Sequence, residues 1–124
     1  HFFASDRDAG AVKMAAANAT RSGVEDLLTV TRQGVSELVR PDTPPGIVLV
    51  NPPYGARIGN RKLLFSVYGA LGKTLLERFS GWRVGIITSD SGLAQATALP
   101  FLAPDAPVSH GGLRVTLHKT APLP

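Results

Sequence analysis

The residues best suited to chemistry in this 124-residue chain are Asn51, Pro52, Pro53 and Tyr54. They follow an apolar run, residues 47–50, that is typical of a parallel strand covered on both faces. The two prolines end the strand and stiffen the turn, because they cannot donate ladder hydrogen bonds and their rings fix φ. Open α/β sheets bind ligands at the carboxyl ends of their strands, so a site is expected at this turn.

The turn offers two hydrogen-bond acceptors, the Asn51 side-chain oxygen and the Pro52 carbonyl. Accepting from the two hydrogens of a planar exocyclic amine, they would direct its nitrogen lone pair toward an electrophile, while Tyr54 supplies an aromatic face for the ring. Such catalysis works by positioning and requires neither a metal nor a nucleophilic side chain. The alternative is a proline-rich loop that merely ends a strand.

The string IVLVNPPYGARIG at residues 47–59 resembles the NPPY motif of class I S-adenosylmethionine-dependent methyltransferases, which modify exocyclic or amide nitrogens. Its continuation from Gly55 to Gly59 is similar to the RNA methylase family that contains the ribosomal and transfer RNA guanine-N2 methyltransferases. This resemblance implies S-adenosylmethionine as cofactor and RNA as partner. It also implies that Asn51 lies beside both the target base and the cofactor.

Residues 1–19 resemble the second strand of that family, its acidic end and the following helix. The resemblance aligns Asp6 with the acid that holds the cofactor ribose, a role that acidic residues also play in dinucleotide folds. Asp8 precedes an alanine-rich stretch and is better explained as a helix N-cap. Gly23 then fits a helix stop.

Residues 27–31, LLTVT, predict a short strand. In the family its end carries an acidic or polar residue near the cofactor's adenine, but this chain has Gln33 and Gly34 there. The resemblance therefore implies that Gln33, Gly34 or a backbone carbonyl contacts the adenine. An exposed polar loop residue is an equally open interpretation of Gln33.

Thirteen Lys and Arg against nine Asp and Glu give a net charge of +4. No acidic residue occurs between Asp42 and Glu77, whereas Arg57, Arg61 and Lys62 follow the turn closely. Basic side chains attract phosphate, so these three are predicted to contact the RNA backbone. The alternative is a solvated loop and helix start.

Apolar residues recur at helical spacing over 63–79, which places Tyr68 in the core. Residues 83–88 predict a strand, residues 91–98 a short helix, and residues 113–119 an antiparallel edge strand, on which His118 is an ordinary strand residue. Together with the resemblance, these elements predict an α/β, Rossmann-like methyltransferase sheet, mostly parallel with an antiparallel last strand.

The first strand of the family and its glycine-rich loop have no counterpart in the sequence. Residues 1–124 are therefore expected to be one partial class I methyltransferase catalytic domain, part of a longer protein with an upstream RNA-binding domain. The piece alone is expected to be inactive, and its uncovered apolar surface could make it a homodimer.

The absence of cysteine excludes disulfides, cysteine nucleophiles and thiolate metal sites. We predict no metal, no membrane segment and a cytoplasmic location. The favoured function is methylation of guanine N2 in ribosomal or transfer RNA. Adenine N6 in DNA and a protein glutamine amide remain open as targets, as does an RNA-binding or assembly module without activity.

Overall fold

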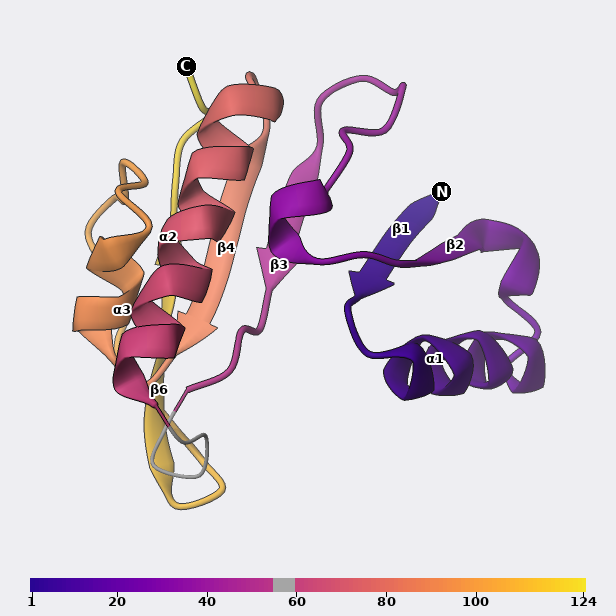
Figure 1. Ribbon diagram of the computed structural model, residues 1–124, viewed down its shortest axis with the longest axis horizontal. Helices are drawn as coiled ribbons and strands as arrows, with labels where there is room; N and C mark the ends of the chain where they lie inside the picture. Colours follow the sequence, from indigo (N-terminus) through magenta and orange to yellow (C-terminus); the bar gives the residue numbers. More distant parts are fainter. Residues whose placement is uncertain (55–59) are drawn as a thin grey trace. The chain divides into compact units, whose positions relative to one another are not determined.

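The computed structural model describes residues 1–54 and 60–124. The chain divides into two compact units, residues 1–41 (unit 1) and residues 42–124 (unit 2), and each is described by itself. Strands and helices alternate along the chain in both units (Figure 1). This alternation is the predicted α/β pattern.

Unit 1 consists of β1 (Phe2–Asp6), α1 (Ala9–Arg21) and β2 (Leu28–Arg32), with 3₁₀ turns η1 (Glu25–Leu27) and η2 (Val35–Glu37). The two strands are parallel, so their carboxyl ends meet at one edge. The Asp8 side chain caps α1 as predicted, accepting a hydrogen bond from the Ala11 N–H at 2.7 Å. After the helix, Gly23 adopts a φ of +69°, which confirms it as the expected stop.

Unit 2 is built around a four-stranded sheet with the order β3-β4-β6-β5. Its elements are β3 (Ile47–Val50), α2 (Arg61–Arg78), β4 (Arg83–Thr88), α3 (Ser91–Ala96), β5 (Val108–His110) and β6 (Leu113–Lys119). β3 and β4 are parallel, while β6 is antiparallel to both β4 and β5. The turn after β3 and the segment after β4 therefore leave the sheet at the same edge.

The core of unit 2 lies between α2 and the sheet, where α2 runs alongside β4 (Figure 1). Six side chains of this layer are at most 5 % exposed: Leu64, Tyr68, Leu71, Leu75, Val84 and Ile86. The four on α2 confirm the helical periodicity predicted for residues 63–79. A buried layer of this kind fixes the sheet edge that carries the candidate site.

The opposite face of the sheet differs from the sequence prediction. Ile47 and Leu49 on β3 are 61 % and 75 % exposed, so the expectation of a strand covered on both faces is wrong for the described residues. α2 packs on the face that carries Val84 and Ile86, whereas Leu49 lies on the other face beside Gly85. Among the described residues, β3 therefore has one covered face.

The predicted edge strand at residues 113–119 is also corrected. β6 is antiparallel as expected, but β5 pairs with its outer side and forms the edge of the sheet. Gly111 and Gly112, with φ values of +55° and +81°, form the two-residue hairpin that joins β5 to β6. The Gly-Gly pair was the sequence signal for this hairpin.

Candidate active site

The predicted turn leaves β3 with alternating burial. Asn51 and Pro53 are exposed, Pro52 is buried and Tyr54 is half-buried. Pro52 thus anchors the turn in unit 2 and leaves the amide of Asn51 accessible. The structure places these four residues at the carboxyl end of β3, as the sequence indicated.

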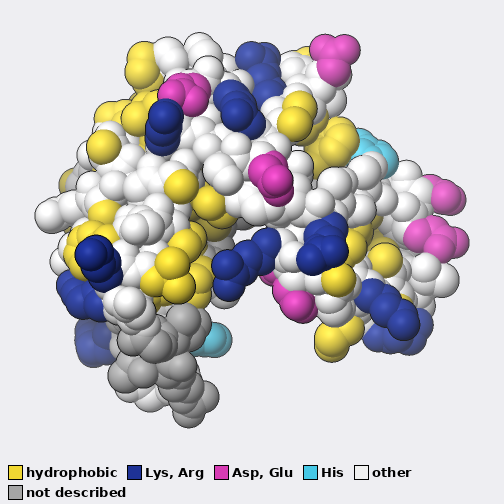
Figure 2. Space-filling view, in the orientation of Figure 1, with side chains coloured by type: hydrophobic (Ala, Val, Ile, Leu, Met, Phe, Trp, Pro, Cys, Tyr) yellow, Lys and Arg dark blue, Asp and Glu magenta, His cyan; other side chains and the backbone are white. Residues whose placement is uncertain are grey.

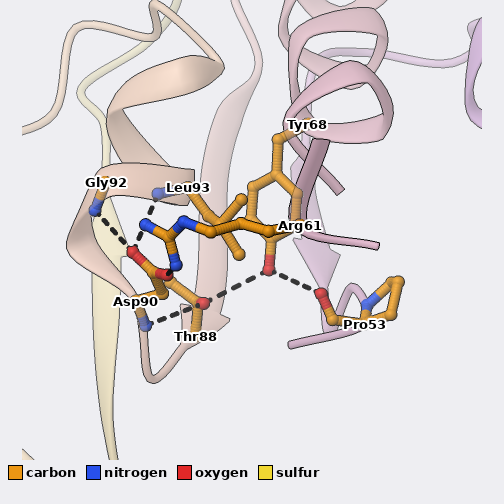
Figure 3. A network of polar contacts seen from close by, with 7 residues as sticks. All are labelled: Pro53, Arg61, Tyr68, Thr88, Asp90, Gly92 and Leu93. Carbon is orange, nitrogen blue, oxygen red and sulfur yellow. Dashed lines mark hydrogen bonds and ion pairs between the residues drawn. The ribbon is translucent and has the colours of Figure 1, made fainter. Parts of the chain in front are cut away.

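The backbone of the turn is bound to the core by a tyrosine. The hydroxyl of Tyr68, a fully buried residue of α2, donates to the Pro53 carbonyl at 3.1 Å and lies 3.2 Å from the Thr88 hydroxyl (Figure 3). Thr88 is the last residue of β4 and in turn accepts from the Asp90 backbone N–H at 3.2 Å. Groups from α2, β4 and the start of α3 therefore support one carbonyl.

The chemistry of the end groups fixes the direction of this chain. The Pro53 carbonyl can only accept and the Asp90 N–H can only donate. A tyrosine hydroxyl has a single hydrogen, so Tyr68 gives its proton to Pro53 and accepts the proton of Thr88. Burial raises the pKa of Tyr68 by more than the hydrogen bond with Thr88 lowers it, and the hydroxyl stays protonated at neutral pH.

Asp90 connects this chain to a basic side chain. Its carboxylate caps α3 by accepting from the N–H groups of Gly92 and Leu93, and it forms an ion pair with Arg61 (Figure 3). Desolvation would raise the pKa of Asp90, but the hydrogen bonds from Arg61 and from these N–H groups together hold it below its usual value. The carboxylate is therefore charged at neutral pH.

The predicted RNA-contacting residues have different surroundings. The guanidinium of Arg61 lies 5.1 Å from the centre of the Phe65 ring while its side chain stays 64 % exposed. The Lys62 side chain is exposed at the start of α2, and Arg57 lies outside the described residues. On the face in Figure 2, Lys and Arg side chains occur at separate places with hydrophobic side chains between them.

In unit 1, the predicted cofactor residues lie together. Asp6 ends β1, and its backbone carbonyl accepts from the Gln33 N–H at 3.0 Å, which brings Gln33 and Gly34 to the same strand edge. The exposed Asp6 carboxylate accepts from the Asp8 N–H at 2.8 Å through Oδ1. A carboxylate has acceptor capacity on both oxygens, so Asp6 can accept from further donors.

Sequence reasoning assigned Tyr68 to the core and gave Thr88 and Asp90 no role. Tyr68 is core, and it also holds the turn. The available signal was the polar segment 88–91 directly after the strand predicted next to residues 47–50. Since parallel strands end at a common edge, this segment was a candidate neighbour of the turn.

Neither a metal site nor a membrane span occurs among the described residues. Over residues 1–54 and 60–124, no group of three His, Asp or Glu side chains is placed to hold a metal ion. In the same residues, no helix is both long and apolar enough to cross a membrane.

The parallel strand ends, the intervening helices and the antiparallel hairpin define an α/β, Rossmann-like methyltransferase fold. The chain belongs to the family described as RMKL-like, methyltransferase domain, whose model matches residues 1–105. The resemblance inferred from residues 47–59 is thereby confirmed at the level of the family. S-adenosylmethionine, the cofactor predicted from the sequence, is the methyl donor of this class.

Solved structures share this fold at low sequence identity. SMU.472, a candidate methyltransferase solved with SAH, is 24 % identical with a TM-score of 0.89, covering 99 % of this chain and 32 % of that one. A possible methylase from Clostridium difficile 630 is 21 % identical with a TM-score of 0.85, covering 99 % of this chain and 32 % of that one. TrmN from Thermus thermophilus is 24 % identical with a TM-score of 0.77, covering 98 % of this chain and 36 % of that one. The chain thus spans about a third of the length of these proteins.

Proposed function

We propose that this chain carries the target-base part of an S-adenosylmethionine-dependent methyltransferase, and that the target is guanine N2 in ribosomal or transfer RNA. One observation carries the proposal: an exposed Asn51 stands at a strand end whose next turn is held by the buried Tyr68 through the Pro53 carbonyl. A turn held in this way can orient a planar amine, and the chain belongs to a methyltransferase family.

Asn51 and Pro52 orient the amine. The side-chain oxygen of Asn51 and the carbonyl of Pro52 each accept one hydrogen of the exocyclic NH2 group, which directs the nitrogen lone pair away from the turn. Tyr54 offers its ring for stacking to a base turned out of its helix or loop. After transfer, the amine loses its extra proton to solvent.

Three of the four predicted cofactor residues, Asp6, Gln33 and Gly34, belong to unit 1. Asp6 accepts hydrogen bonds from the ribose hydroxyls, and Gln33 with Gly34 borders the adenine. The family resemblance assigns Asn51 a cofactor contact as well. When bound, S-adenosylmethionine supplies an electrophilic methyl group on a sulfonium sulfur.

The basic residues after the turn hold the nucleic acid. Lys62 and Arg61, both exposed at the start of α2, contact phosphates, and Arg57 in the family string is assigned the same role. Because Arg61 also pairs with Asp90, its contact with RNA competes with an existing ion pair. Lys62, whose side chain takes no part in that pair, is therefore the cleaner test of RNA contact.

The test uses the full-length protein, unmodified ribosomal and transfer RNA, and a radiolabelled methyl donor. Digestion of the product to nucleosides should place the label in N2-methylguanosine. Asn51→Ala should lower the transfer rate at least about a hundredfold, because the amine loses one of its two acceptors, while S-adenosylmethionine affinity stays within about twofold. In parallel reactions that offer DNA or protein in place of RNA, label in N6-methyladenine or in a glutamine would replace the assigned target.

A further inference from the structure

We propose that Tyr68 is a positioning residue for methyl transfer, which acts by fixing the Pro53 carbonyl and through it the acceptor at Pro52. The inference rests on the proposed function, because it concerns the reaction that the turn performs. Tyr68 does not touch the reacting atoms; its effect passes through the backbone of the turn.

The first step is the cost of the buried hydroxyl. Tyr68 is 0 % exposed, and Thr88, its second partner, is 1 % exposed. A phenylalanine would fill almost the same volume without burying a polar group, and burial of an unpaired hydroxyl is unfavourable. Here the hydrogen bonds to Pro53 and Thr88 offset the cost of burying the Tyr68 hydroxyl. What the hydroxyl adds over a phenylalanine is a defined position for the Pro53 carbonyl.

Few rotatable bonds separate the Pro53 carbonyl from the Pro52 carbonyl. The pyrrolidine ring locks φ of Pro53 near −65°, within about 15°. The peptide between Pro52 and Pro53 is planar, so it has no soft dihedral of its own. The one soft dihedral between the Pro53 carbonyl and the plane that contains the Pro52 carbonyl is then ψ of Pro53, and the bond from Tyr68 restricts this dihedral because it holds the Pro53 carbonyl oxygen.

Tyr68 is itself hydrogen-bonded to groups at the end of β4 and the start of α3. Thr88 gives its proton to Tyr68 and accepts from the Asp90 N–H, so the turn is tied to the end of β4 and the start of α3. Asp90 in turn caps α3 and pairs with Arg61. The position of the turn is therefore fixed by hydrogen bonds to packed elements and not by contacts within its own loop.

The test is a graded series in the full-length protein. Tyr68→Phe should lower kcat about ten- to a hundredfold, with KM for RNA and the Kd of S-adenosylmethionine within about twofold of wild type. Thr88→Val, which keeps the bond from Tyr68 to Pro53, should lower kcat about three- to tenfold. Thr88→Ser should recover most of that loss, since the hydroxyl is restored.

Thr120→Val is the matched control. It also removes a buried hydroxyl in unit 2, the one that accepts from the Val84 N–H at 3.0 Å, but at β4 and away from the turn. Its kcat should equal that of wild type at temperatures where both are folded. Equal losses of kcat in Thr120→Val and Tyr68→Phe would overturn the inference, because the effect would then be one of stability.

A readout independent of activity is the carbonyl ¹³C resonance of Pro53. Pro53–Tyr54 is a proline–tyrosine peptide, so labelling with carbonyl-¹³C proline and ¹⁵N tyrosine selects its signal, assigned by its loss in Tyr54→Phe. Tyr68→Phe should move this resonance to higher field, and Thr120→Val should leave it in place. An unmoved resonance in Tyr68→Phe would contradict the hydrogen bond itself.

The inference and the proposed function fail differently. If Asn51→Ala abolishes transfer but Tyr68→Phe retains wild-type kcat, only the positioning role of Tyr68 is overturned. If Asn51→Ala retains wild-type transfer, the proposed function falls, whatever Tyr68→Phe does.

Discussion

The two candidate strand ends are held in different ways. In unit 1, the exposed Asp6 is held by backbone groups, its carboxylate by the Asp8 N–H and its carbonyl by the Gln33 N–H after β2. In unit 2, the turn at Pro53 is held by buried side chains, Tyr68 and Thr88, from two other elements. Of the buried apolar side chains in residues 1–54 and 60–124, Ala19 alone comes from unit 1.

The difference matches the two roles proposed for these strand ends. A carboxylate that only binds two hydroxyls tolerates small displacements, whereas an acceptor that aims a lone pair at a reacting carbon does not. We therefore expect unit 2 to be sensitive to changes in packing, and unit 1 to be sensitive mainly to loss of the carboxylate itself.

The largest effect is expected where the layer behind the turn is tightest. A Cβ at Gly72 of α2 would lie 1.8 Å from the Thr97 backbone oxygen, so Gly72→Ala must displace α2 from α3. We expect a loss of about 3 kcal/mol in unfolding free energy. Trp82 is the single tryptophan of the chain and lies in unit 2, so denaturant unfolding followed by its fluorescence reports this loss.

Gly23→Ala is the matched control in unit 1. Gly23 has a φ of +69°, and a Cβ added there would meet no heavy atom within 4 Å, so the cost is conformational, about 1 kcal/mol. The fluorescence transition of Trp82 should shift less in this variant than in Gly72→Ala. A larger shift in Gly23→Ala than in Gly72→Ala would refute the contrast between the units.

A smaller effect is expected from the charge of Asp90. Its pKa is lowered in the folded chain, so the stabilisation is present above the unfolded pKa and is lost as pH falls through the folded one. Asp90→Asn keeps the capping oxygen and removes the charge. Its deficit, below about 1 kcal/mol because Arg61 is largely exposed, should be seen at pH 7 and vanish at low pH. A deficit that grows on acidification would contradict the ion pair.

The smallest effect concerns the RNA. Lys62→Ala should weaken RNA binding about threefold at physiological salt and reduce the slope of log affinity against log salt by about one. Lys13→Ala, an exposed lysine of α1 in unit 1, is the control and should leave the slope unchanged. Equal slopes for both variants would remove Lys62 from the RNA contact.

Much of the fold could be predicted because local patterns decide it. The apolar run of β3 and the helical spacing of α2 indicated these elements within a few residues. Exposure of Leu49 could not be predicted in this way, since a continuous apolar run does not tell how many faces are covered. β5 was missed because it is three residues long, and only the glycines at 111 and 112 indicate it.

The candidate site was predictable where single residues carry it. Asn51 and Pro52 stand out by type, and Asp6 by its place after a strand. The role of Tyr68 depends on a partner twenty positions away and on how α2 packs over β4, which no local pattern records. A tyrosine at core spacing generally needs a partner for its hydroxyl, and that partner can belong to a site.

Two roles are proposed, cofactor binding for Asp6 and orientation of the target amine for Asn51. Titration calorimetry with S-adenosylmethionine, paired with the transfer assay, tests them most directly. Asp6→Asn in the full-length protein should weaken cofactor binding about tenfold or more, since a charged acceptor is lost. Asn51→Ala should bind the cofactor within about twofold of wild type and transfer methyl groups at least about a hundredfold more slowly. Wild-type cofactor binding in Asp6→Asn, or loss of binding together with transfer in Asn51→Ala, would contradict the assignment of the two strand ends.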